Sequence, residues 1–276
     1  MKPPADRIAL VVSDVDGTLV TKDKQLTPEV LAATARLRAA GVPLALVSSR
    51  PPRGIASVIE ALGVDMPCAG FNGGVVFRPN CEIIAKRPLA AAMARVAVET
   101  LTRRGADVWL FTEGAWLARD HSGAYVPKET RTVGFGPRIV DGFDVFFDHA
   151  FKVVGASPEP DLLVAAEAEL RTLFGGEATA SLSQPYYLDA TDAAAHKGTA
   201  VADIARALGI DLDNVATIGD GANDVPMFEI AGLSIAMGNS SVDTRARAHF
   251  ETTSNEKSGF ATAIERFVLP RVGARR

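Results

Sequence analysis

The sequence predicts an α/β fold, with a parallel sheet of the Rossmann type as its core and a second α/β domain inserted into that core. Short apolar runs rich in β-branched residues occur at 8–12, 42–47 and 214–218, as in strands buried on both faces. A helical pattern follows each run, which is typical of parallel βαβ units. The region between has helices and strands of its own, which indicates a separate domain.

The first part of the core is expected at residues 1–84. After the strand at 8–12, Thr27 and Pro28 provide the cap and the proline that commonly begin a helix. Gly41 supplies a favourable stop for that helix. The strand at 42–47 is followed by a further helical stretch.

The inserted domain is expected at residues 85–186, with proline near both junctions, at Pro88 and Pro185. Its expected helices lie near 89–104 and 158–174, and its expected strands at 107–111, 151–154 and 178–182. The core resumes at residues 187–276. Its expected elements are helices at 197–208, 223–231 and 259–268, and strands at 214–218 and 233–236.

The composition narrows the possible functions. The 276 residues are 47% hydrophobic and 22% charged, with a formal net charge of −4. A weakly acidic chain has no general attraction for nucleic acid or anionic lipid, so we expect neither as a partner. Cys68 and Cys81 lack metal-ligand spacing and are interpreted as reduced, packed thiols of a cytoplasmic protein. The sequence predicts no oligomeric state.

Two acidic loops follow apolar strands. Asp14 and Asp16 come directly after the first strand, and Asp220 and Asp224 follow the strand at 214–218. Open α/β sheets place their ligand sites at the carboxyl ends of strands. Closely spaced carboxylates repel one another unless a cation or proton intervenes, and a hard divalent ion such as Mg²⁺ suits oxygen ligands. Taken singly, the first loop could also be an acidic surface turn, and the second could be a turn-forming or calcium-binding segment.

Two further polar residues stand at the expected starts of helices. Ser48 ends the strand at 42–47 and precedes a helix, where a hydroxyl and free N–H groups can bind an anion or simply cap the helix. Lys197 stands at another helix start and could be an ordinary surface lysine. A cation and Lys197 together would offset the charge of Asp14, Asp220, Asp224 and a phosphate. This coincidence at strand ends is more specific than any single residue.

At this point the chain resembles the haloacid dehalogenase-like (HAD) superfamily, in its Cof-type subfamily (subclass IIB) of sugar-phosphate phosphatases. The four family motifs occur in order, as SDVDGTL at 13–19, VSSR at 47–50, Lys197-Gly198, and GDGANDVPMF at 219–228. Residues 71–74 (FNGG) resemble the Asn-Gly segment that precedes the cap domain in Cof-type members. Ser48 and Ser49 replace the commoner threonine and glycine of the second motif.

The resemblance implies a mechanism. Asp14 would attack phosphorus and Asp16 would protonate the leaving oxygen, then activate water against the aspartyl-phosphate. It also implies that Mg²⁺ is held by Asp14, Asp16 (through its carbonyl), Asp220 and Asp224, and the phosphoryl group by Ser48, Ser49, Lys197 and Asn223. The substrate would be a small-molecule phosphate ester, and the residues expected to contact it are Asn72, Arg50, Arg119 and His121. Further cap candidates are Trp116, Tyr125, Arg131 and Lys152.

Two alternatives share this constellation. A phosphotransferase of the phosphomannomutase type would return phosphate to a sugar instead of water. A phospho-accepting signalling module of the receiver type would also combine acids, a hydroxyl and a lysine on parallel strands, but it has no inserted cap. Release of inorganic phosphate separates the expected phosphatase from the phosphotransferase. A phosphoryl-aspartate that lasts for minutes without turnover would indicate the signalling module.

Overall fold

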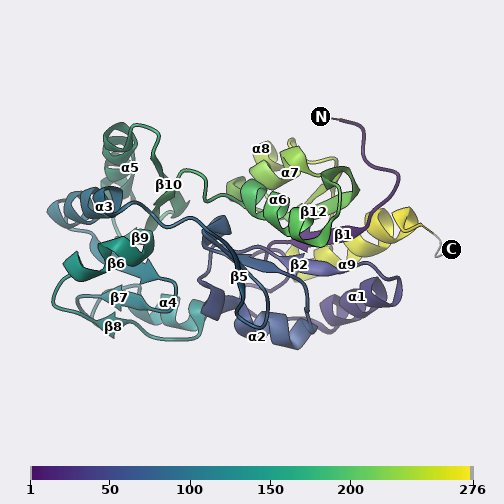
Figure 1. The fold of residues 1–276 in the computed structure, drawn as a ribbon, viewed down its shortest axis with the longest axis horizontal. Coiled ribbons are helices and arrows are strands. Elements are labelled where there is room, and N and C mark those ends of the chain that lie inside the picture. The colour runs from purple at the N-terminus through teal and green to yellow at the C-terminus, as the bar shows by residue number, and fades with distance from the viewer. Residues whose placement is uncertain (1, 274–276) are drawn as a thin grey trace. The chain divides into compact units, whose positions relative to one another are not determined.

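The computed structural model describes residues 2–273, which fall into two compact units. The core unit comprises the chain up to Ser49, residues 56–85, and the chain from His196 onward. The inserted unit comprises residues 50–55 and 86–195. Both units alternate helices with strands (Figure 1).

The core unit is built on a five-stranded sheet in the order β14-β13-β12-β1-β2, and every neighbouring pair is parallel. Its strands are β1 (Leu10–Ser13), β2 (Leu44–Leu46), β12 (Val215–Gly219), β13 (Leu233–Ala236) and β14 (Phe250–Glu251). A smaller sheet contains β3 (Cys68–Gly70), β4 (Val75–Phe77) and β5 (Ile83–Lys86). The helices are α1 (Pro28–Ala39), α2 (Pro52–Leu62), α6 (Lys197–Leu208), α7 (Val225–Ile230), α8 (Val242–Arg245) and α9 (Gly259–Ala263).

Strand register decides where the polar loops of the core unit meet. Ser13, the last residue of β1, lies opposite Ile218 of β12 and Leu46 of β2. Because the strands are parallel, the residues that follow each of them emerge at the same edge of the sheet. The predicted parallel α/β core is therefore confirmed.

Local sequence fixes the helices that flank this edge. The Thr27 hydroxyl accepts a hydrogen bond from the Val30 amide at the start of α1, as the cap signal predicts. At the start of α6, the imidazole Nδ1 of His196 accepts a hydrogen bond from the Thr199 amide, and Gly209 ends the helix with φ of 66°. The inner face of α6 packs on the sheet through buried Val201 and Ile204, part of the core unit's hydrophobic cluster.

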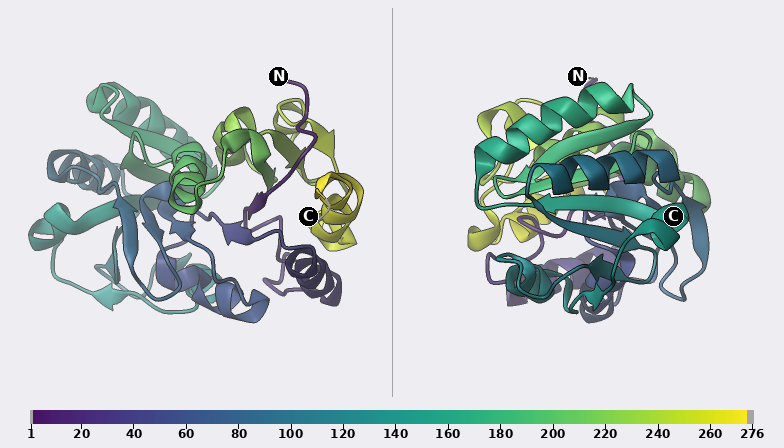
Figure 2. Two further views of the ribbon diagram at one scale, coloured as in Figure 1. Left: turned by 45° about the vertical axis from the view of Figure 1, so that its right-hand side comes forward. Right: turned by 90° about the vertical axis from the view of Figure 1, so that its left-hand side faces the viewer.

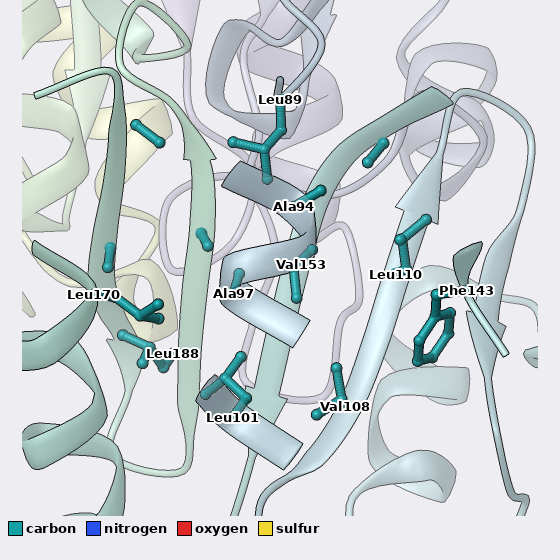
Figure 3. Close-up of a cluster of buried hydrophobic side chains, with 14 of the residues drawn as sticks. Leu89, Ala94, Ala97, Leu101, Val108, Leu110, Phe143, Val153, Leu170 and Leu188 are labelled. Carbon is teal, nitrogen blue, oxygen red and sulfur yellow. The ribbon is translucent and has the colours of Figure 1, made fainter. Parts of the chain in front are cut away.

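The inserted unit has its own six-stranded sheet, in the order β10-β11-β9-β6-β7-β8. The strands are β6 (Asp107–Thr112), β7 (Trp116–Ala118), β8 (Arg138–Ile139), β9 (Ala150–Ala156), β10 (Ala178–Gln184) and β11 (Tyr187–Asp192). Helices α3 (Ala91–Arg103) and α5 (Pro160–Phe174) lie over one face of this sheet (Figure 2), and the shorter α4 (Val126–Val133) follows β7. Leu101, Val153 and Leu170 pack between these layers in a hydrophobic cluster (Figure 3).

Two expectations need adjustment. The boundary expected at residue 186 falls within the β10–β11 hairpin, and β11 pairs with both β10 and β9, so the inserted unit extends to Ala195. Cys68 is buried, and burial raises the pKa of its thiol to about 12. Cys81 is exposed in a turn with φ of 67°, so the expectation of packed thiols was wrong for Cys81.

Candidate active site

Asp14 is the first residue beyond β1 and is only 4% exposed. Its backbone amide donates a hydrogen bond to the Ile218 carbonyl (2.9 Å), which continues the pairing of β1 with β12. The sheet therefore fixes the backbone of Asp14 at the edge where the second acidic loop begins.

Lys197, at the first turn of α6, is 1% exposed and lies between two carboxylates. Its Nζ is 2.5 Å from Oδ1 of Asp14 and 2.5 Å from Oδ1 of Asp224. Burial acts to lower the pKa of Lys197, but the charges of Asp14 and Asp224 outweigh it and raise the pKa above its ordinary value. Lys197 is thus a buried ammonium ion and not a surface lysine.

Asp224 organises the loop after β12 and is completely buried. Its Oδ2 accepts hydrogen bonds from the backbone amides of Asp220 and Gly221, each at 2.8 Å, while its Oδ1 accepts from Lys197. A Cβ atom at Gly219 would lie 2.4 Å from the Asp224 carboxyl carbon, so only glycine leaves room for this arrangement. The loop sequence therefore needs both the acid and the glycine.

Asp220 completes an acidic cluster with Asp14 and Asp224. One carboxylate oxygen from each of the three lies within 4.8 Å of the others. Burial, followed by the negative charge of Asp224, raises the pKa of Asp220 to about 7, and burial also raises the pKa of Asp14 well above its ordinary value although Lys197 opposes this. These carboxylates repel one another more than a single lysine can offset, and their donor set is the hard oxygen set that Mg²⁺ prefers.

Asp16 lies in the loop after β1 and pairs with a residue that the sequence did not single out. Its Oδ1 is 2.6 Å from the Nζ of Lys24, and the two side chains are 26% and 36% exposed. The intervening chain folds back on itself, with β-bridges from Val20 to Asp16 and to Leu26. Asp16 is thus more accessible than Asp14.

Ser48 is buried two residues after the end of β2, and both its amide and its carbonyl make backbone hydrogen bonds. Its amide donates to the Ala69 carbonyl (2.9 Å), and its carbonyl accepts from the Asn72 amide (2.8 Å). Ser49 follows and is half-buried. The second predicted motif therefore lies beside the segment at 71–74.

Asn72 and Asn223 form a direct link between two predicted motifs. The Asn223 Nδ2 donates a hydrogen bond of 3.1 Å to the Asn72 Oδ1. Asn72 and the buried Phe71 before it both have positive φ, of 55° and 53°. Such backbone conformations are unusual for residues other than glycine, although asparagine tolerates them better than phenylalanine. The backbone is therefore held in an unusual conformation where Asn72 reaches Asn223.

The remaining candidates lie in the inserted unit. Arg50 is buried and donates to the Gly54 carbonyl (3.1 Å), whereas Arg119, His121 and Arg131 are exposed and Tyr125 is half-buried. Trp116 is 1% exposed and stacks on Phe111, with ring centroids 5.7 Å apart. Lys152 is paired with Asp189 at 3.3 Å. Trp116 and Lys152 are therefore buried among residues of their own unit, and the substrate contacts of this unit stay predictions.

The sequence interpretation missed Lys24 and Asn239. Asn239 donates to the carboxylate of Asp220 and to the carbonyl of Gly17, each at 3.0 Å. One signal could have found it, because Asn239 lies in the turn after the buried strand β13, three residues beyond its end, at the edge of the sheet where Asp14 and Asp220 follow β1 and β12. Lys24 has no such signal, since its contact with Asp16 depends on how the loop folds back.

The chain is similar to known proteins over most of its length. Residues 11–264 match the model of the family described as haloacid dehalogenase-like hydrolase. A proposed phosphatase of Streptococcus pyogenes serotype M6 is 30% identical over 267 residues, which cover 95% of this chain and 99% of that protein. The 5-amino-6-(5-phospho-D-ribitylamino)uracil phosphatase YwtE of Bacillus subtilis is 23% identical over 94% of this chain and 97% of its own.

The fold comparison gives the same result. The crystal structure of a haloacid dehalogenase-like hydrolase from Bacteroides thetaiotaomicron superimposes with a TM-score of 0.85 at 25% identity, covering 94% of this chain and 99% of that chain. The matches are to hydrolases, which favours an enzyme over a phospho-accepting signalling module. Within residues 2–273, every helix is too short or too polar to cross a lipid bilayer.

Proposed function

The chain belongs to the haloacid dehalogenase-like hydrolase family and is a phosphatase, and we propose from this premise that it uses Mg²⁺ and an aspartyl-phosphate on Asp14. The substrate class we propose is a small phosphorylated metabolite of the sugar-phosphate type. The single observation that carries the proposal is the convergence of Asp14, Asp220, Asp224 and Lys197 within hydrogen-bonding or metal-binding distance. These residues come from three separate segments of the chain.

The residues present fit a divalent cation. The raised pKa values of Asp14 and Asp220 reflect burial and mutual repulsion, which a cation with oxygen ligands would relieve. Asp14 and Asp220 would bind it with their side chains and Asp16 with its carbonyl. Asp224, whose oxygens already accept three hydrogen bonds, would hold the loop that carries Asp220. Bound Mg²⁺ supplies positive charge that favours ionised Asp14 and offsets the charge of the phosphoryl oxygens.

The first chemical step belongs to Asp14 and Asp16. A carboxylate oxygen of Asp14 attacks phosphorus, and the bond from phosphorus to the leaving oxygen breaks as Asp16 gives that oxygen its proton. Lys197 fixes the plane of the Asp14 carboxylate through Oδ1 and places positive charge beside the reacting group. Ser48, Ser49 and Asn223 would orient the phosphoryl oxygens by hydrogen bonds.

The second step regenerates the enzyme. Asp16, now ionised, accepts a proton from water as the water oxygen attacks phosphorus, and the bond from phosphorus to Asp14 breaks to release phosphate. Lys24 lies close enough to Asp16 to stabilise its ionised form between the two steps. No other oxidant, reductant or acceptor is required, so the reaction balances as hydrolysis of a phosphate ester.

The substrate class rests on the relatives. The name of the Bacillus subtilis relative specifies a phosphate on a ribityl chain, and that relative matches nearly the whole of this chain. A polyol or sugar phosphate therefore suits the proposal better than a phosphoprotein or nucleic acid, toward which a chain of net charge −4 has no general attraction.

The test combines a substrate panel with one substitution. We expect purified protein to release inorganic phosphate from sugar and polyol phosphates with Mg²⁺, and to stop when a chelator is added. Asp14→Asn should abolish release while the protein stays folded, because an amide is a poor nucleophile. Phosphate release by Asp14→Asn at the wild-type rate, or equal release with excess chelator, would exclude the proposal. Transfer of phosphate to a second sugar without free phosphate would identify a phosphotransferase instead.

A further inference from the structure

Asn239 connects the two acidic loops of the core unit. It lies in the turn after β13, and its side-chain Nδ2 is 3.0 Å from Oδ2 of Asp220 and 3.0 Å from the carbonyl oxygen of Gly17. Gly17 belongs to the loop after β1 and Asp220 to the loop after β12. One neutral amide group thus joins both loops that carry the acidic cluster.

The orientation of the Asn239 amide is determined by its partners. Its Oδ1 accepts a hydrogen bond from the Asn255 backbone amide at 3.1 Å, and a backbone N–H can only donate. The Gly17 carbonyl and the Asp220 carboxylate can only accept, so the NH₂ group must face them. All three partners therefore agree on a single orientation.

The turn that carries Asn239 is itself anchored. The Gly238 amide donates to the Thr253 carbonyl (3.1 Å), and the Met237 amide donates to the Gly219 carbonyl (2.9 Å). The Asn255 side chain is 8% exposed and donates to the Val20 carbonyl (2.9 Å). Asn239 is therefore held against the loops that follow three other strands, β1, β12 and β14, which suits a residue that fixes the position of another.

A metal-binding carboxylate benefits from a neutral donor of this kind. A hydrogen bond to one oxygen fixes the rotation of the carboxylate and leaves electron pairs for a cation, without the positive charge by which a lysine would compete. Gly17 contributes by being small, because a Cβ atom there would lie 2.2 Å from the same Oδ2 of Asp220. Asn239 and Gly17 thus approach Asp220 together.

We propose that Asn239 is a positioning residue that orients Asp220 for a divalent cation through the bond from Nδ2 to Oδ2. The proposal rests on the proposed function, since it assigns Asp220 to the metal. Asn239 acts through Asp220 and touches neither substrate nor the reacting atoms.

The test measures metal binding directly. Isothermal titration of substrate-free protein with Mg²⁺ should give a dissociation constant about 10-fold or more higher for Asn239→Ala than for the wild type. The Mg²⁺ concentration for half-maximal activity should rise in parallel, while kcat at saturating Mg²⁺ stays within about threefold of the wild type. Asn239 is exposed and lacks a positive φ, so alanine suits the turn; Asn239→Ser serves with the same expectation if the alanine variant does not fold.

Ser241→Ala is the matched control. Ser241 lies two residues beyond Asn239, and its hydroxyl accepts a hydrogen bond from the Thr244 amide. Loss of this hydroxyl therefore loosens the same segment without touching Asp220. We expect this variant to unfold at a lower temperature and to bind Mg²⁺ as the wild type does. If the Mg²⁺ dissociation constant of Asn239→Ala stays within twofold of the wild type, or rises equally in Ser241→Ala, the role proposed for Asn239 is overturned and the proposed function is not. Absence of Mg²⁺ binding by the wild type overturns the proposed function as well.

Discussion

The Nζ of Lys197 lies 2.5 Å from Oδ1 of Asp14, although the two residues are 183 positions apart in the sequence. Lys197→Met keeps the length of this side chain and removes its charge, leaving Asp14 and Asp224 buried without their cation. We expect the free energy of unfolding in a chelator to fall by about 3–5 kcal/mol, as when one partner of a buried ion pair is removed. Phosphatase activity should fall by at least about 100-fold.

Urea unfolding and steady-state kinetics measure both effects of Lys197→Met. Lys2→Met is the control, because Lys2 pairs with Asp213 at 3.3 Å but is 81% exposed and should contribute little. Equal stability changes for the two variants would contradict the role given to Lys197.

Asp16→Asn should slow hydrolysis most for substrates with poor leaving groups. An asparagine cannot supply the proton that an alkyl phosphate needs at its leaving oxygen, whereas p-nitrophenol departs without one. We expect kcat for a sugar phosphate to fall by about 10²–10⁴-fold. With p-nitrophenyl phosphate, the rate at which p-nitrophenol is released in the first turnover should fall by less. Asp23→Asn, an exposed acid in the same loop, is the control. If the first-turnover rate of leaving-group release fell by the same factor for both substrates, Asp16 would be excluded as the acid.

Gly17→Ala should abolish Mg²⁺ binding and activity. Gly17 has φ of 77°, and a Cβ atom there would lie 2.2 Å from the Asp220 Oδ2, so alanine displaces the Asp220 carboxylate. Gly175→Ala is a matched control, because φ is also positive there (56°) but no atom lies within 4 Å of the added Cβ. The control should lose about 1 kcal/mol of stability and keep its activity. Metal titration of both variants distinguishes displacement of Asp220 from backbone strain.

Asn72→Gly should weaken the binding of phosphate. Glycine accepts the positive φ at this position but removes the hydrogen bond that orients Asn223. We expect the inhibition constant for inorganic phosphate to rise about 2–10-fold, which corresponds to one hydrogen bond. Asn223→Ala should cause at least as large a rise, and the double variant should be no worse than Asn223→Ala alone. Additive effects in this cycle would show that Asn72 acts separately from Asn223.

The stability of the metal-free protein should fall as pH rises. The pKa of Asp220 is about 7 in the folded chain against an ordinary value of 3.8, so between these values the folded state binds a proton that the unfolded state has released. The stabilisation is complete below about pH 4 and is lost as pH rises through about 7. The raised pKa of Asp14 acts in the same direction.

Thermal unfolding in a chelator from pH 5 to 8 measures this dependence. Saturating Mg²⁺ should remove the decline, because the cation replaces the proton among the carboxylates. Asp220→Asn should flatten the curve without metal. A melting temperature that rises with pH in the metal-free wild type would contradict the environment described for Asp220.

Motifs that follow apolar strands were readable from sequence. Asp14, Ser48 and Asp220 each come directly after a buried run, and parallel strands bring such positions to one edge of a sheet. Lys197 was found through its helix start and its chemistry. By contrast, Trp116 was a plausible substrate contact until stacking on Phe111 placed it in the interior. All three residues of β7 are buried, so its sequence pattern does not separate a substrate contact from a residue of the interior.

The sequence by itself determined the parallel core, the presence of an inserted α/β unit and the residues of the acidic cluster, because strand periodicity and strand-end position are local properties. Only the tertiary structure decided that Asp224 binds the backbone of its own loop, that Lys24 pairs with Asp16, and that Asn239 reaches both Gly17 and Asp220. These contacts depend on the paths of loops and on atoms placed to within a few tenths of an ångström. Local hydrophobic patterning does not encode such positions, because they arise when separate segments pack against one another.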